Sequence, residues 1–333
     1  MSLLELTAIE RDFPAGRPGL GALLRPTSIP RVAVLRGVTL SVDAGEWYCL
    51  IGQNGTGKTT LLRIAAGLTR PTAGSVRIDG RDVTKGDARD LVGYALADER
   101  SFHWRLSSFH NLLFFARLEG MRTPEARRRV DQLLERFDLG AARERPFGEL
   151  STGMRQRLAI ARGLLVVPRV LLMDEPTRSL DPGHATDAMR VVRDELRANN
   201  GCVLMVTHQL EQALSDANRI GVLHDGVIRE ELTPDSLART ARGSEGVTVS
   251  VRGMPAATIG VLRLVRGVRD IHVASSAAGE QVLEVWAQPG ELALDVLIRE
   301  LTQSGAQITG LQRGTPMQAL LDRLSQIREP VSA

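Results

Sequence analysis

The fold of this chain is decided by the stretch Gly52-Gln53-Asn54-Gly55-Thr56-Gly57-Lys58-Thr59, which fits the phosphate-loop pattern G-x-x-x-x-G-K-[ST]. An apolar run over 47–51 leads into it and predicts a strand, and the run over 61–66 predicts a helix after it. The glycines allow a tight turn whose N–H groups point at phosphate oxygens, and the N-terminus of the helix favours an anion. The stretch therefore predicts a binding site for a nucleoside triphosphate.

Two side chains of this loop have expected roles of their own. Lys58 is expected to reach the outer phosphates, and the Thr59 hydroxyl is expected to hold Mg²⁺. Lys58 and Lys85 are the two lysines among 42 Lys and Arg residues, and a lysine at the loop position indicates a need for a flexible point charge. The predicted nucleotide-binding set of the loop is Gly52, Gln53, Asn54, Gly55, Thr56, Gly57, Lys58, Thr59 and Thr60.

The composition is that of a soluble globular protein. The 333 residues suffice for two domains, and 43% of them are hydrophobic and 24% charged. No apolar run approaches the roughly 18 residues of a membrane-spanning helix, and the first residues lack the features of a signal peptide. Cys49 and Cys202 lie in apolar, strand-like runs, so we expect buried thiols and a reducing cytosol. The net charge is +3 and no basic stripe is interleaved with aromatic residues, so we expect no nucleic-acid partner.

The pattern along the chain predicts an α/β fold. Strand-like runs at 3–10 and 32–42 and a hairpin-like stretch at 75–80 flank the loop and its helix, and residues 109–162 have helical periodicity. Strands and a helix then alternate at 170–173, 185–198, 202–206 and 220–223. This alternation is typical of a mostly parallel sheet covered by helices. We predict a nucleotide-binding domain at 1–237 with a helical subdomain at about 98–165.

A second, smaller domain is predicted at 246–333, after a linker at 238–245. The expected order of its elements is β-α-β-β-α-β, which resembles a ferredoxin-like unit. The expected ranges are 247–251, 256–264, 271–273, 282–286, 292–301 and 308–311. A last amphipathic helix is expected to place Met317, Leu320, Leu321 and Leu324 on one face.

A second motif, Asp174-Glu175, follows the apolar run 170–173. An Asp-Glu pair alone is usually a solvated turn, but four apolar residues directly before it favour the tip of a buried strand. Asp174 is therefore a candidate to hold Mg²⁺, and Glu175 is a candidate to polarise the water that attacks a γ-phosphate.

Three further motifs occur in order along the chain. The stretch Leu150-Ser151-Thr152-Gly153-Met154 precedes the acidic strand: Ser151 can cap a helix, and Gly153 allows its N-terminus to approach a phosphate closely. Ser179-Leu180-Asp181 follows the carboxylates, and Thr207-His208 ends a later strand. Each of these short motifs is weak alone. Together with the phosphate loop and the acidic strand, they resemble the ATPases of ABC transporters over residues 3–235.

The resemblance implies a P-loop NTPase of ABC type, with an antiparallel β subdomain and a helical subdomain, that uses ATP and Mg²⁺. It implies that Glu175 and His208 are catalytic, and that Ser151, Thr152 and Gly153 contact ATP held by the phosphate loop of a partner subunit. The chain has one set of motifs, so it is expected to pair with a second copy or a homologous ATPase subunit. An integral-membrane permease is the other implied partner, which would place the chain at the cytoplasmic face of the cell membrane.

Two positions depart from the family pattern. Asp98 stands where relatives carry a glutamine, so it is a candidate metal ligand and γ-phosphate sensor, or else part of an exposed acidic loop. Phe13 stands near the tyrosine that stacks on adenine in relatives, so it is a candidate for stacking or for the core. The loop at 14–31 is longer than usual, and a solvated loop is the default interpretation.

The Leu-Ser-Thr-Gly-Met form and the C-terminal appendage resemble exporter ATPases for drugs, antibiotics, lipids or polysaccharides. The rings of Phe102, His103 and Trp104 are expected either to anchor a permease helix or to pack under the helical subdomain. A non-transport ABC ATPase acting on ribosomes or DNA is the alternative. A catalytically inactive regulatory subunit is disfavoured by Lys58 and the other motif residues.

Overall fold

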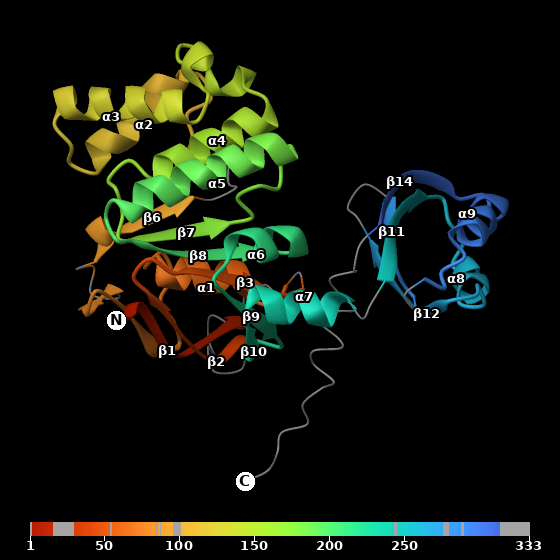
Figure 1. The fold of residues 1–333 in the computed structure, drawn as a ribbon. Coiled ribbons are helices and arrows are strands. Elements are labelled where there is room, and N and C mark those ends of the chain that lie inside the picture. The colour runs from red at the N-terminus through yellow and green to blue at the C-terminus, as the bar shows by residue number, and fades with distance from the viewer. Residues whose placement is uncertain are drawn as a thin grey trace, which may run out of the picture. The chain divides into compact units, whose positions relative to one another are not determined.

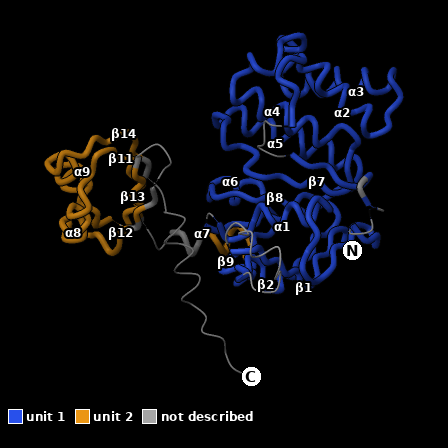
Figure 2. The backbone as a smooth tube through the Cα atoms, turned by 180° about the vertical axis from the view of Figure 1, so that it is seen from behind, with its two compact units in different colours: residues 1–231 blue, residues 232–333 orange. Residues whose placement is uncertain are grey.

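The computed structural model describes residues 2–15, 30–53, 55–83, 86, 88–95, 101–242, 245–275, 280–287 and 290–313. Asn54, Asp98, most of the loop at 14–31 and the expected helix around Met317 and Leu324 lie outside these residues. The chain forms two compact units, residues 1–231 and 232–333 (Figure 2). None of the helices in the described ranges has the length and apolar content needed to span a bilayer.

A parallel sheet of predominantly apolar strands forms the centre of the first unit (Figure 1). Its strand order is β10-β9-β3-β8-β7-β6, and β3, β6, β7, β8 and β9 are joined by parallel pairings. Every residue of β3 and β8 is buried, as expected for strands covered on both faces. The strands are β3 (Trp47–Ile51), β6 (Val92–Ala95), β7 (Val170–Asp174), β8 (Cys202–Thr207), β9 (Arg219–His224) and β10 (Val227–Leu232).

A second, antiparallel sheet has the order β2-β1-β4-β5. Residues 32–42, where the sequence predicted a strand, lie in β2, and its buried residues alternate at Val38, Leu40 and Val42. Asp79 and Gly80 both have positive φ and form the tight turn between β4 and β5. The strands are β1 (Ser2–Pro14), β2 (Arg31–Asp43), β4 (Ala73–Ile78) and β5 (Arg81–Asp82).

One apolar core joins both sheets. It contains Leu4 of β1, Leu61 of helix α1 (Lys58–Ala65) and Leu204 of β8, so α1 packs between the sheets. Helix α6 (Leu210–Asp216) contacts β3 and β8, and α5 (Pro182–Arg197) covers the same face of the parallel sheet in Figure 1. This packing buries the strand that leads into the phosphate loop on both of its faces.

The helical subdomain is formed by α2 (Ser108–Leu118), α3 (Thr123–Arg136) and α4 (Thr152–Gly163). The hydroxyl of Ser107 accepts a hydrogen bond from the backbone of His110, and Ser151 caps α4 in the same way. The periodicity predicted helices within 109–162. The three helices exceed that range only by Ser108 at the start of α2 and Gly163 at the end of α4. The sequence analysis missed β6, which is short, and β10, whose sequence Val-Ile-Arg-Glu-Glu-Leu is half charged.

The second unit contains a four-stranded sheet in the order β12-β13-β11-β14, with antiparallel pairing throughout. From residue 245 on, its elements follow the predicted order β-α-β-β-α-β, and Leu262 of α8 and Leu301 of α9 pack on the strands. These elements are β11 (Glu245–Arg252), α8 (Thr258–Leu262), β12 (Val268–Ser275), β13 (Glu280–Ala287), α9 (Leu294–Gln303) and β14 (Gln307–Arg313). Helix α7 (Pro234–Arg242) occupies residues 238–242 of the stretch that was predicted to be a linker.

Gly221 of β9 has too little room for a side chain. Its added Cβ would lie 2.2 Å from the hydroxyl of Tyr48, which is fully buried and donates to Glu231 Oε1 at 2.6 Å. We expect Gly221→Ala to lower the free energy of unfolding by about 1–3 kcal/mol through overpacking, as measured by urea denaturation. Gly183→Ala in α5 is the control, since its nearest atom lies at 3.4 Å and alanine favours a helix. An equal loss of stability in both variants would contradict this prediction.

Candidate functional site

The phosphate loop leaves the carboxyl end of β3 and enters α1 at Gly57. Gly57 has a φ of 103°, and an added Cβ would lie 2.8 Å from Leu35 Cδ2 and 3.0 Å from Val34 Cγ1. A Cβ at Gly52 would lie 2.5 Å from the carbonyl oxygen of Leu223. Glycine is therefore required at both positions, at Gly57 by backbone conformation and at Gly52 by the close approach of β9.

Lys58 is folded back onto the loop. Its Nζ donates to the carbonyl oxygens of Gly52 and Gln53, both at 2.7 Å, and the residue is 7% exposed. Burial lowers the pKa of Lys58 below its usual value, and the carboxylates of Glu175 and Asp174 partly oppose that shift. The ammonium group is thus held at the mouth of the loop with negative charge nearby.

Asp174 lies at the end of β7 beside the first turn of α1. The Thr59 hydroxyl donates to Asp174 Oδ2 at 2.9 Å. Burial raises the pKa of Asp174, while the bond from Thr59 acts in the opposite direction. Among the residues that the structure describes, no group of three His, Cys, Asp or Glu could form a metal cage. A hydroxyl next to one carboxylate is instead the oxygen donor set that suits Mg²⁺ bound together with phosphates.

Glu175 has a strained backbone and a side chain held by two neighbours. Its φ is 49°, and its N–H donates to the carbonyl of Val206 at 2.9 Å. His208 Nδ1 lies 2.7 Å from Glu175 Oε1, and the Thr207 hydroxyl donates to Oε2 at 3.2 Å. Thr207 is fully buried and also accepts from the backbone N–H of Gln209 at 3.0 Å. The sequence identified His208 but gave no role to the Thr207 hydroxyl, because only the tertiary structure brings β8 against Glu175.

These groups surround one pocket of about 520 Å³. The phosphate loop and α1 contribute Gly55, Gly57, Lys58, Thr59 and Thr60, and the strand ends contribute Asp174, Glu175 and His208. Val34 and Arg178 also line the pocket. Neither residue belongs to a motif, so the sequence pattern did not predict them as site residues.

Ser151, Thr152 and Gly153 are not lining residues of this pocket. Ser151 is exposed and accepts from the backbone N–H of Met154 at 3.2 Å, so it caps α4. A Cβ at Gly153 would lie 3.2 Å from the carbonyl oxygen of Ser179. The structure therefore brings the segment 151–153 against the loop at 179–181 and leaves Ser151 and Thr152 open to solvent.

Phe13 lies near the end of β1 and is 37% exposed. The Arg11 guanidinium lies 4.7 Å from the centre of its ring, and Phe13 is not a lining residue of the pocket. The half-exposed ring is therefore not a core residue.

The rings at 102–104 divide between the two expected roles. Phe102 is buried and stacks on Phe147 with a centroid distance of 4.6 Å, so it packs within the helical subdomain. Trp104 is 51% exposed, with the Arg155 guanidinium 4.7 Å from its ring centre, and His103 is also exposed. His103 and Trp104 therefore remain available to a partner.

Comparison with known proteins identifies the family. The family model described as ABC transporter matches residues 35–178. The chain is 41% identical over 198 residues to the taurine import ATP-binding protein TauB of Mesorhizobium japonicum, covering 59% of this chain and 75% of that relative. The chain belongs to the ABC transporter family. It is an ABC-type ATPase, the ATP-binding and ATP-hydrolysing subunit of a transport system.

Another relative and a solved structure extend this result. The daunorubicin resistance ATP-binding protein DrrA3 of Streptomyces coeruleorubidus is 36% identical over 234 residues, covering 69% of this chain and 73% of that relative. The dimeric, post-hydrolysis structure of the ATP-binding cassette MJ0796 with ADP and phosphate has a TM-score of 0.60 and 25% identity, covering 69% of this chain and 98% of that chain. The relatives of this ABC ATPase thus include an importer subunit and a drug-resistance subunit, so membership alone does not give the direction of transport.

Gly57 offers a test of the phosphate loop. We expect Gly57→Ala to weaken ATP binding by at least about tenfold, because the left-handed φ costs about 1–2 kcal/mol and the Cβ also displaces Val34 and Leu35. Gly55→Ala is the matched control, since its φ is also positive but no atom lies within 4 Å of the added Cβ. Titration with a fluorescent ATP analogue measures both. A larger loss for Gly55→Ala would contradict the prediction.

Proposed function

We propose that this ATPase powers a separately encoded membrane permease that exports drugs, lipids or polysaccharides. The observation that carries the ATPase part is the convergence of Lys58, Thr59, Asp174, Glu175 and His208 on one pocket. The export direction is supported by the Leu150–Met154 motif, by the C-terminal unit and by the likeness to DrrA3. The likeness to TauB favours import as the second candidate.

The residues of the pocket have distinct proposed roles. The N–H groups of residues 52–60 and the Lys58 ammonium bind the phosphates of ATP. Thr59 and Asp174 fit Mg²⁺, which supplies charge neutralisation at the phosphates when bound. Glu175 orients and polarises the attacking water, and Thr207 holds one carboxylate oxygen of Glu175 while it does so.

The side chains of His208 and Glu175 are in direct contact. The 2.7 Å contact between Nδ1 and Oε1 holds the carboxylate away from water on that oxygen. We propose that His208 turns to the γ-phosphate of ATP, which frees this oxygen for the attacking water. His208 is 47% exposed, so its ring has room to turn.

A second ATPase subunit completes the site. Ser151 and Thr152 lie outside the pocket of their own chain and are exposed at the N-terminus of α4, where a partner's ATP would meet the positive end of the helix. We propose a head-to-tail dimer, with a second copy or a homologous subunit, in which Ser151–Gly153 of each chain contact the ATP of the other. The proposed docking surface for the permease includes the exposed His103 and Trp104.

We also propose roles for the second unit, for Phe13 and for Asp98. The strand order and antiparallel pairing of the second unit support a ferredoxin-like fold for it, as an accessory domain that stabilises the dimer or regulates it. The half-exposed ring of Phe13 suits stacking on adenine, and Asp98 is proposed to take the place of the usual glutamine.

Glu175 is the residue to test first. We expect Glu175→Gln to lower kcat for ATP hydrolysis by about 10²–10⁴-fold, because the amide cannot act as a base, and to leave ATP affinity within about twofold. Steady-state hydrolysis and nucleotide titration measure the two quantities. Glu211→Gln, at an exposed position of α6, is the control and should behave as wild type. Full activity in Glu175→Gln would exclude the role of this carboxylate.

The composite site is tested by mixing two inactive variants. Lys58→Ala removes the phosphate-binding side of the site, and Ser151→Ala together with Gly153→Ala removes the partner's side. Each homodimer then has two broken sites, whereas a mixed dimer has one intact site. We expect hydrolysis to reappear when the two proteins are mixed. If no activity returns although mixed dimers form, the head-to-tail arrangement is wrong.

The direction of transport requires the permease. Tagged Glu175→Gln protein, purified with ATP from gently solubilised membranes, should retain a polytopic partner that mass spectrometry can identify. In vesicles that contain both subunits with the ATPase outside, ATP-dependent accumulation of a drug or lipid inside supports export. Ribosomal or DNA-binding proteins in place of a permease would favour the non-transport alternative.

A further inference from the structure

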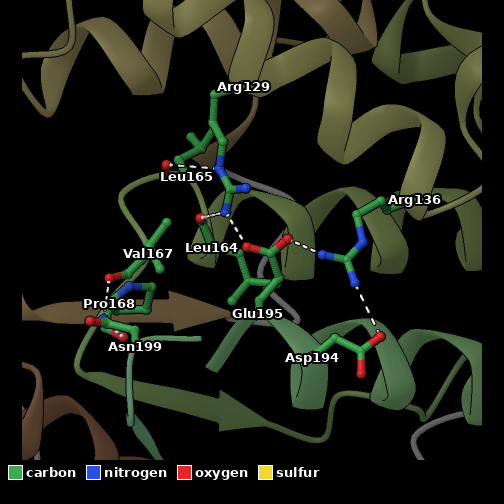
Figure 3. Close-up of polar contacts among 9 residues, drawn as sticks. All are labelled: Arg129, Arg136, Leu164, Leu165, Val167, Pro168, Asp194, Glu195 and Asn199. Atoms are coloured by element: carbon green, nitrogen blue, oxygen red, sulfur yellow. Dashed lines mark hydrogen bonds and ion pairs between the residues drawn. The ribbon is translucent and has the colours of Figure 1, made fainter. Parts of the chain in front are cut away.

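Glu195 forms a buried ionic contact between the helical subdomain and α5. Glu195 is 8% exposed, and each of its two carboxylate oxygens contacts an arginine of α3 (Figure 3). Arg129 Nη2 lies 2.6 Å from Oε2, and Arg136 Nη1 contacts Oε1. Arg129 and Arg136 are seven residues, or two helical turns, apart, so they project from the same face of α3. We call these three residues the Glu195 clamp.

The clamp also holds the end of α4. Arg129 donates from Nη2 to the carbonyl of Leu164 at 2.7 Å and from Nε to that of Leu165 at 3.3 Å. Leu164 is the C-cap of α4, whose last carbonyls have no partner within the helix and carry the negative end of its dipole. Figure 3 shows the Arg129 guanidinium between these carbonyls and Glu195. The clamp therefore joins the C-terminal ends of α4 and α5 through α3.

Asp194 supplies the second negative charge that balances the two arginines of the clamp. Arg136 Nη2 also lies 3.2 Å from Asp194 Oδ2, so two guanidinium groups face two carboxylates. Arg129 is only 14% exposed, and Glu195 is the carboxylate that compensates it. Loss of the Glu195 charge would leave that guanidinium buried without its counter-ion, and we expect α3 to shift away from α5 in response.

The other ends of α4 and α5 carry the motifs that the dimer uses. Ser151 caps α4, Asp181 caps α5, and Gly153 lies against the carbonyl of Ser179. A helix of 12 residues is about 18 Å long, so a tilt of about 5° at the clamp moves the Ser151 end by about 1.5 Å. A displacement of that size is enough to misplace a group that contacts the transition state.

We propose that Glu195 is a positioning residue for ATP hydrolysis. Through Arg129 and Arg136 it sets the orientation of α4 relative to α5, and thereby presents Ser151–Gly153 correctly to the ATP of the partner subunit. The inference rests on the proposed composite site. Glu195 would thus contribute to hydrolysis although it does not line the pocket.

The test compares Glu195→Gln with an exposed ion pair of the same helix. Asp187 and Arg190 form that pair at 2.8 Å, with both side chains about two-thirds exposed, so Asp187→Asn removes a carboxylate charge from α5 without touching the clamp. For the full chain with each change we would measure kcat and KM for ATP hydrolysis, affinity for a fluorescent ATP analogue, and ATP-dependent dimerisation in the Glu175→Gln background.

We expect Glu195→Gln to lower kcat by about tenfold and to weaken dimerisation by a similar factor, while nucleotide affinity stays within about twofold. Glu195→Asp keeps the charge, so its kcat and dimerisation should lie between those of Glu195→Gln and of the wild type. Arg136→Met removes one of the two ion pairs of Glu195. Because the Arg136 side chain is 35% exposed, we expect this variant to fold and to show a smaller loss of kcat and of dimerisation. Asp187→Asn should match the wild type.

Three results would overturn the proposal. A folded Glu195→Gln protein with wild-type kcat would show that the clamp does not position α4. An equal fall in kcat and in nucleotide affinity would show general damage to the core, and an equal loss in Asp187→Asn would show a general effect of charge. Failure of the wild-type chain itself to dimerise with ATP, or hydrolysis by the monomer, would instead refute the composite site on which the inference rests.

Discussion

The parallel register of β3, β7 and β8 is the constraint on which the site depends. Ile51 is level with Thr207 across the first pair, and Asp174 is level with Val206 across the second. Parallel strands end at the same edge of a sheet, so the phosphate loop, the acidic pair and the histidine segment leave it side by side. A slip of one residue in either pairing would turn alternate side chains to the other face and separate Thr59 from Asp174.

This arrangement keeps charged groups largely out of water. Burial lowers the pKa of Lys58 and raises that of Asp174, so each charged form is less favourable here than in solution. The protein limits the cost by internal bonds from Lys58 to loop carbonyls and from Thr59 to Asp174. Charged phosphate oxygens are stronger acceptors for the Lys58 ammonium than the neutral carbonyls of Gly52 and Gln53 are, which favours the binding of nucleotide. The left-handed backbone at Glu175 is a further strained feature at the same place.

Helices α4 and α5, which begin after Ser151 and Asp181, are connected at both ends. Near Ser151 and Asp181 the connection is steric, because Gly153 lies against Ser179, and at the far ends it is ionic, through Glu195. A steric contact limits approach in one direction, whereas the charge-assisted bonds of two arginines oppose separation. Together they define one relative orientation of α4 and α5. The proposed role of the clamp is to keep that orientation while the subunits close on ATP.

The sequence by itself determined the α/β class, the phosphate loop, the acidic strand and the order of elements in the second unit. These features depend on local patterns: glycines where φ is positive, apolar runs for buried strands, and a serine that caps a helix. Only the tertiary structure decided that Thr207 holds Glu175, that Phe102 is buried while Trp104 is exposed, and that Glu195 meets two arginines of α3. Each of these contacts joins residues tens of positions apart, and no local pattern encodes which distant side chains share a buried space. The structure also placed a helix over much of the predicted linker, because the pattern there marked a change of composition and not the conformation of the chain.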